Sequence, residues 1–115
     1  MESYLLLLHM KTERPNLSPE EMQAITAKYK AWGQRLGVQG RLAGGEKLAN
    51  EAGRQMIGKG ADLRISDGPF IETKDVIGGF FIVKAESYDE AVALCRDCPH
   101  LEYGNGIEVR RIEVV

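Results

Sequence analysis

Two short apolar segments, far apart in the sequence, restrict the possible folds of this chain more than any other feature. Residues 3–10 and residues 77–85 are both strongly apolar and are bounded by polar residues. Segments of this length and composition are typical of buried or half-buried β-strands. We therefore predict two strands, the first of them central in a sheet. Gly78 and Gly79 in the second segment predict a close backbone approach or a β-bulge.

A helix of about five turns is predicted after the first strand. Ser18 is a favourable N-cap, Pro19 suits the first helical position, and the two glutamates that follow complement the helix dipole. Apolar residues then recur at steps of three and four, and they are Met22, Ile25, Tyr29, Trp32 and Leu36. This spacing predicts one apolar stripe facing the sheet.

A second helix is predicted after residues 77–85, with Ser87 as its N-cap. We expect Pro99 to stop this helix, because proline has no backbone N–H to donate. The residues predicted on its inner face are Tyr88, Ala91, Val92, Cys95 and Cys98.

The remaining segments have weaker patterns. Residues 41–66 alternate around several glycines, which predicts two short strands or a hairpin. Residues 67–70 read Asp-Gly-Pro-Phe and form a turn by composition. Residues 106–115 predict a closing strand.

The predicted order places the chain in the α+β class as a single domain over residues 1–115. In a split β-α-β arrangement the first and last long strands lie side by side in an antiparallel sheet, with both helices on one face. The other face would still expose apolar side chains, including Leu5, Leu7, Phe80 and Ile82 or their neighbours. A homodimer formed through this sheet face is the economical way to cover them.

Composition and charge argue against several classes of partner. The formal net charge is −2, from 15 basic and 17 acidic residues spread along the chain, so no basic stripe is available for nucleic acid. The longest apolar run is too short to span a bilayer and lacks the flanks of a signal peptide. We therefore expect a cytoplasmic protein that contacts neither membrane nor nucleic acid directly.

The most distinctive segment is residues 67–81, which read DGPFIETKDVIGGFF. Glu90-Ala91, Cys98-Pro99 and the Ile-Glu-Val-Arg run at 107–110 follow in order. With these motifs the whole chain resembles the DGPF branch of the YCII-related family. Two departures are Arg111, where such sequences often carry proline, and residues 44–60, which show no recognisable motif.

The resemblance implies a ferredoxin-like β-α-β-β-α-β domain that dimerises through its sheet, as in the dimeric α+β barrel group. Relatives include enzymes that act on small cyclic or aromatic compounds, and a His and Asp pair has suggested an active site. Other members are fused to, or encoded beside, alternative sigma factors. Two hypotheses follow: a cofactor-independent lyase or isomerase, or a non-catalytic dimeric module that binds a ligand or regulates transcription.

His9 and Asp67 are the candidate catalytic pair. His9 lies near the end of the first strand, and Asp67 opens the turn after a strand that ends at Ile65. Within hydrogen-bond reach, the carboxylate would orient the imidazole as a general base. The alternative is structural, with His9 at a strand end and Asp67 bonded within its own turn.

Four further residues are candidates for binding a substrate. Arg110 in the closing strand has the donor geometry to hold a substrate carboxylate. Glu72 and Lys74 lie on the loop after Asp67 and equally suit a clamp that fixes this loop to the sheet. Phe70 is predicted to bury its ring in the core or in the dimer interface.

Cys95 and Cys98 form a Cys-x-x-Cys pair at the end of a helix. The helix dipole and Asp97 both disfavour a thiolate there, so we expect buried structural cysteines rather than a redox pair. With only His100 nearby, the pair also falls short of a zinc site. Neither glycine pair has the spacing of a phosphate-binding loop, and we expect no metal and no cofactor.

Overall fold

The computed structural model describes residues 1–11, 16–51, 53–67 and 75–115. Its elements, in chain order, are β1 (Glu2–Lys11), α1 (Pro19–Val38), β2 (Leu42–Lys47), β3 (Arg54–Ile57), a 3-10 turn (Gly60–Asp62), β4 (Arg64–Asp67), β5 (Asp75–Ala85), α2 (Tyr88–Cys95), α3 (Pro99–Glu102) and β6 (Gly106–Arg111). No helix in the described ranges is both long and apolar enough to cross a membrane.

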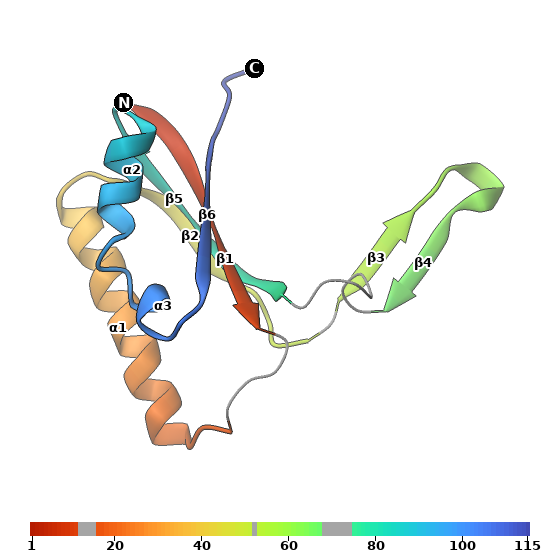
Figure 1. The fold of residues 1–115 in the computed structure, drawn as a ribbon, viewed down its shortest axis with the longest axis horizontal. Helices are drawn as coiled ribbons and strands as arrows, with labels where there is room; N and C mark the ends of the chain where they lie inside the picture. The colour runs from red at the N-terminus through yellow and green to blue at the C-terminus, as the bar shows by residue number, and fades with distance from the viewer. Residues whose placement is uncertain (12–15, 52, 68–74) are drawn as a thin grey trace.

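The main sheet has four antiparallel strands in the order β2-β5-β1-β6. Figure 1 shows all three helices on one face of this sheet. The predicted antiparallel α+β fold is therefore confirmed, including the neighbouring first and last strands and the ferredoxin-like strand order. β1 is a central strand, with β5 on one side, β6 on the other and the helices over one of its faces.

Residues on alternating faces of β1 have different surroundings. Tyr4, Leu6 and Leu8 are buried toward the helices, whereas Leu5 and Leu7 are only half-buried on the opposite face. The core on the helical side comprises Tyr4, Leu6, Trp32, Leu36, Val83, Ala85, Ala91, Cys95 and Cys98. The opposite face, which we call the open face, is not covered by any of the described helices (Figure 1).

Helix α1 begins as predicted. Ser18 accepts a hydrogen bond from the Glu21 backbone N–H at 3.1 Å, and the Glu21 side chain accepts one from the Ser18 N–H at 3.2 Å. The predicted stripe is correct only in its second half. Trp32 and Leu36 are buried, but Met22 is 54% exposed because the first turns of α1 extend past the strands (Figure 1).

The prediction for the second helix was wrong in two respects. Tyr88 and Val92 are exposed, although the Tyr88 hydroxyl accepts the Arg111 N–H at 2.8 Å. Pro99 does not stop α2, which ends at Cys95; it instead begins α3. Proline is favourable in the first turn of a helix because the N–H it lacks would have no partner there.

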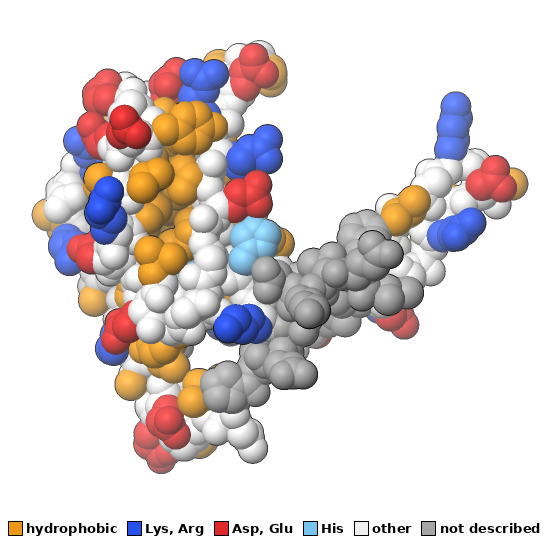
Figure 2. Space-filling view, in the orientation of Figure 1, with side chains coloured by type: hydrophobic (Ala, Val, Ile, Leu, Met, Phe, Trp, Pro, Cys, Tyr) orange, Lys and Arg blue, Asp and Glu red, His pale blue; other side chains and the backbone are white. Residues whose placement is uncertain are grey.

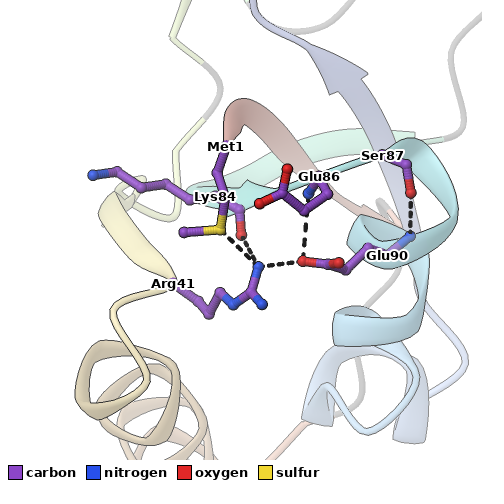
Figure 3. A network of polar contacts seen from close by, with 6 residues as sticks. All are labelled: Met1, Arg41, Lys84, Glu86, Ser87 and Glu90. Atoms are coloured by element: carbon purple, nitrogen blue, oxygen red, sulfur yellow. Dashed lines mark hydrogen bonds and ion pairs between the residues drawn. The ribbon is translucent and has the colours of Figure 1, made fainter.

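Arg41, between α1 and β2, connects the helical layer to the sheet (Figure 3). Its guanidinium is paired with Glu90 of α2 and donates to the Lys84 carbonyl at 3.3 Å. Its own carbonyl accepts the Lys84 N–H at 2.7 Å. The Glu90 backbone N–H in turn donates to the Ser87 hydroxyl at 3.2 Å, so one network fixes the connection from β5 to α2.

Gly79 of β5 lies where the backbones of β2 and β5 approach closely. A Cβ added to it would lie 2.7 Å from the Glu46 carbonyl oxygen. The pairing of β1 with β5 also shifts register between Leu8 and His9, opposite the glycine pair. Both effects predicted from Gly78 and Gly79, the close approach and the irregularity, are therefore present.

Residues 41–66 form a strand of the main sheet, β2, and a separate hairpin, β3–β4. We predicted two short strands or a hairpin in this region; the structure has a hairpin, and in addition a strand that joins the main sheet. The hairpin stands away from the sheet and helices in Figure 1, and Figure 2 shows apolar side chains exposed on it between charged ones. Phe70, Glu72 and Lys74 lie outside the described residues.

Candidate functional site on the open sheet face

His9 lies near the end of β1 with its side chain on the open face. Its cross-strand neighbours are Ile77 of β5 and Gly106 of β6. The imidazole Nε2 lies 3.0 Å from Glu108 Oε1. Glu108 pairs with Leu7, two residues before His9, so the two polar side chains are diagonal neighbours on one face.

Arg110 extends this pair into a cluster of three. It follows Glu108 by two residues and therefore shares its face of β6. One guanidinium nitrogen lies 3.3 Å from Glu108 Oε2. The hydrogen bond from His9 and then that from Arg110 lower the pKa of Glu108, so the carboxylate is ionised at neutral pH.

The charge of Glu108 fixes the protonation of the imidazole. An ionised carboxylate only accepts hydrogen bonds, so His9 Nε2 must carry the proton in this contact. In the neutral ring the other nitrogen, Nδ1, is then the unprotonated one. The side chains of His9 and Glu108 are 29% and 42% exposed, so solvent reaches part of each.

A buried histidine supports the backbone of His9 from the helical side. His100 of α3 is 1% exposed, and its Nε2 donates to the His9 carbonyl oxygen at 2.7 Å. Its Nδ1 is therefore the acceptor and receives the Tyr29 hydroxyl at 2.7 Å. Desolvation lowers the pKa of His100 and raises that of Tyr29 to about 12, so both are neutral.

The structure brings together only some of the predicted site residues. His9 and Arg110 are joined through Glu108. Asp67, at the end of β4, instead pairs with Arg54 of β3 at 2.8 Å, and within the chain it does not meet His9. The His9–Asp67 contact and the roles of Phe70, Glu72 and Lys74 stay predictions.

Sequence reasoning missed Glu108 and His100. Glu108 carried only a partial signal: alternation along residues 106–111 places it on the same face as Arg110, but its contact with His9 depends on the register of β6 with β1. The sequence also placed this strand beside β1. His100 carried no comparable signal, because its role depends on where a short helix docks.

The two cysteines have the surroundings expected of structural residues. Both are free thiols and both are buried, Cys95 at 4% exposure and Cys98 at 2%. Burial raises the pKa of Cys95 to about 12 and also raises that of Cys98. The prediction that both cysteines are buried is confirmed.

Two shallow hollows on the described chain lie away from His9. One, of about 300 Å³, is on the exposed part of α1, lined by Met22 and Lys30 among others. The second, of about 340 Å³, lies between α1 and α2 near Asp97. Among the described residues, His9, Glu108 and Arg110 keep side-chain exposures of 29%, 42% and 68%, so the cluster is partly open to solvent. The described residues hold no group of three or more side chains suited to a metal ion.

Comparison with known proteins gives one family and one fold. The model of the YCII-related domain matches residues 4–115. The uncharacterized protein R00369 of Rhizobium meliloti (strain 1021) is 31% identical over 91 residues, which cover 78% of this chain and 68% of that protein.

A similar solved structure is 5-chloro-2-hydroxyhydroquinone dehydrochlorinase from Burkholderia phenoliruptrix AC1100, in complex with 2,5-dihydroxybenzoquinone. The match has a TM-score of 0.55 and 23% identity, and it covers 98% of this chain and 95% of that one. At this identity the likeness establishes the fold alone.

Proposed function

The chain belongs to the family of YCII-related domains, and on this premise we propose that it is a cofactor-independent enzyme of the lyase or isomerase type. Its substrate would be a small cyclic compound and its general base His9. The observation that carries the proposal is the 3.0 Å contact between His9 Nε2 and Glu108 Oε1 on an accessible face. A histidine oriented by a carboxylate is a common general base at neutral pH.

In this reaction His9 Nδ1 takes a proton from the substrate. The ring then becomes an imidazolium, which the ionised Glu108 stabilises through the bond at Nε2. Arg110 is 68% exposed and carries donors that can bind a substrate oxygen as negative charge develops on it. A ring with acidic hydroxyl groups would offer both a proton for His9 to take and an oxygen for Arg110 to bind.

The similar dehydrochlorinase supports this substrate class. Its name specifies a chlorinated hydroxyhydroquinone, and its structure contains a dihydroxybenzoquinone. Loss of hydrogen chloride requires a base to take the proton while chloride leaves, and isomerisation begins with the same proton removal. His9 as a general base could therefore begin either the elimination of hydrogen chloride or an isomerisation.

We also propose that the protein is a homodimer joined through the open face. Leu5, Leu7, Phe80 and Ile82 are on this face and only half-buried in the single chain. A second copy would bury them and would enclose the His9 cluster, which the described residues of a single chain leave partly exposed.

The first test is turnover and binding with hydroxylated rings. Turnover is measured as chloride release from 5-chloro-2-hydroxyhydroquinone. Binding is measured separately, as the absorbance change on adding 2,5-dihydroxybenzoquinone. We expect His9→Gln to lower kcat/KM by about 10²-fold or more, the usual contribution of a general base. Glu108→Gln should have a smaller effect, because it removes the orienting charge but leaves the imidazole.

The matched control is Glu102→Gln. It removes an exposed carboxylate that lies away from the site and is paired with Lys28, with 3.0 Å between Glu102 Oε1 and Lys28 Nζ. It should leave kcat/KM unchanged. Wild-type protein that neither binds nor converts a panel of hydroxylated and halogenated rings would contradict the proposal. Binding without turnover, unaffected by His9→Gln, would instead identify a ligand-binding module. The comparisons do not support the sigma-factor-linked alternative.

A further inference from the structure

His9 lies at an irregular point of the main sheet. The register of β1 with β5 shifts between Leu8 and His9, and Gly78 is left over as an extra residue in the opposite strand. An extra residue of this kind disrupts the hydrogen-bond ladder locally and bends the strand. On the side of β5, the direction of the His9 side chain is therefore not fixed as it would be in a regular ladder.

The neighbouring strand on the other side gives the imidazole little lateral support. His9 pairs there with Gly106, which is the first residue of β6 and the end of the register. Packing between directly opposite side chains normally helps to hold a side chain on a sheet, and glycine offers none. The orientation of the His9 ring therefore depends more strongly on the backbone that carries it.

The helical layer holds this backbone. His100 of α3 is 1% exposed, and its Nε2–H donates to the His9 carbonyl oxygen at 2.7 Å. The other ring nitrogen, Nδ1, accepts the Tyr29 hydroxyl at 2.7 Å. The rings of Tyr29 and His100 also meet edge to face, with their centroids 6.0 Å apart. Tyr29 of α1 therefore holds the His100 ring, and this ring holds β1.

These contacts continue through the sheet to the candidate site. On the open face, His9 Nε2 lies 3.0 Å from Glu108 Oε1. A series of hydrogen bonds therefore runs from Tyr29 through His100 and the backbone of His9 to Glu108, and it links α1, α3, β1 and β6. A movement of the peptide group of His9 would change how its ring approaches Glu108.

We infer that His100, held by Tyr29, is the positioning residue of the candidate base, and that its bond to the His9 carbonyl keeps the imidazole against Glu108. His100 does not reach the substrate itself, because it is 1% exposed and both of its ring nitrogens are bonded within the protein. The inference rests on the proposed function for the catalytic use of His9. The orientation of His9 is tested without any turnover.

The direct test follows the ring nitrogens of His9 by nitrogen-15 NMR. The chain has two histidines, so the remaining imidazole signals in His100→Leu belong to His9. In the wild type we expect the proton of the neutral ring at Nε2, where Glu108 accepts it. His100→Leu removes the donor to the His9 carbonyl. Signals of both neutral tautomers should then appear, because the ring is no longer held against Glu108.

A second readout is the pKa of Glu108. The hydrogen bond from His9 is the largest of the causes that lower it. In His100→Leu this pKa should therefore rise toward its ordinary value of 4.5. His100→Gln should restore most of both readouts, because an amide can donate to the His9 carbonyl and accept from Tyr29. A wild-type tautomer and a wild-type Glu108 pKa in folded His100→Leu would overturn the inference.

Leu36→Ala is the control for a general loss of stability. Leu36 is 2% exposed in the same helical layer, and the cavity lowers stability without removing a bond between His100 and the site. Both readouts should keep their wild-type values in this variant, and equal changes in Leu36→Ala and His100→Leu would refute a specific role for His100.

Tyr29→Phe replaces His100→Leu if that protein does not fold. Without the Tyr29 hydroxyl, the His100 ring is free to turn away from the His9 carbonyl. Both readouts should shift in the same direction as in His100→Leu, and the His9 signals are identified by their absence from His9→Gln. Wild-type readouts in Tyr29→Phe would then contradict the inference.

The contribution to catalysis is measured as turnover of the hydroxylated rings, with each rate divided by the folded fraction. His100→Leu should lower kcat roughly 10-fold or more, because a small displacement of a base from its productive geometry is costly. KM should change by less than about twofold, since Arg110 still binds the substrate. His100→Gln should recover most of kcat, and Leu36→Ala should keep all of it.

The two readouts separate the two possible failures. A wild-type kcat in His100→Leu, together with altered NMR signals, would refute the role of His100 in catalysis. A wild-type protein that converts none of the rings would contradict the proposed function, and the NMR signals would still decide whether His100 positions His9.

Discussion

The Nε2 nitrogen of His100 lies 2.7 Å from the carbonyl oxygen of His9, so a buried histidine holds the backbone of the exposed one. His100 is on α3 on the helical side of the sheet, whereas the His9 side chain is on the open face. The backbone at the candidate site is therefore held by a hydrogen bond from the helical layer. Several measurable consequences follow from this contact and from the packing around it.

Stability should fall as pH is lowered from about 7.5 to 5.5. Desolvation lowers the pKa of His100 below its ordinary value of 6.5, so the unfolded chain binds a proton at this residue before the folded chain does. This contribution to stability is present above pH 6.5 and is lost as pH falls toward the folded-state pKa. Urea unfolding across this range measures it.

The control for this pH dependence is His100→Gln, which cannot be protonated. It should lower stability at pH 7.5 but flatten the slope between pH 7.5 and 5.5. The lowered pKa of Glu108 acts in the same direction, but below the ordinary carboxyl value of 4.5, outside this window. An unchanged slope in His100→Gln would show that another group is responsible.

Tyr29→Phe should destabilise the protein by about 1–3 kcal/mol, because the buried Nδ1 of His100 loses its donor. Tyr103→Phe is the control, since Tyr103 is 41% exposed and surface changes usually cost less than about 0.5 kcal/mol. Chemical unfolding of both variants at pH 7.5 measures the difference. Equal costs would mean that the Tyr29–His100 bond does not stabilise the folded state.

Much of the architecture could be predicted because its signals are local or periodic. The apolar run at residues 3–10 fixed β1 as a central strand, and Ser18 and Pro19 marked the start of α1. Pro99 misled the prediction, because a proline that ends one helix and a proline that begins the next look alike in sequence.

The candidate site was less accessible, because it depends on register between distant strands. His9 could be singled out by its position at the end of an apolar run. Its partner Glu108 follows only once residue 7 is known to pair with residue 108. Asp67 was attractive for its place in a distinctive motif, yet in the chain its carboxylate meets Arg54, which sequence patterns did not indicate.

The native cysteines should resist thiol reagents. Burial raises the pKa of Cys95 to about 12 and raises that of Cys98, so little thiolate forms at pH 8. Labelling should therefore be slow until urea unfolds the chain. A cysteine introduced at the exposed position Ala27 should react quickly in the folded protein, and equal rates for native and introduced thiols would argue against this burial.

Gly79→Ala should destabilise the protein by about 1–3 kcal/mol or more, as overpacking of a rigid site usually does. The added Cβ would lie 2.7 Å from the Glu46 carbonyl oxygen, and the adjoining backbone cannot easily yield because Leu48 N–H donates to the Gly78 carbonyl at 3.0 Å. Gly37→Ala is the matched control. No atom lies within 4 Å of its added Cβ, and alanine is the better helix former, so it should stabilise by about 0.5–1 kcal/mol. Urea unfolding of the two variants should give opposite signs. A neutral Gly79→Ala would mean that β2 and β5 can separate without cost, and that this edge of the sheet does not rigidly support the open face.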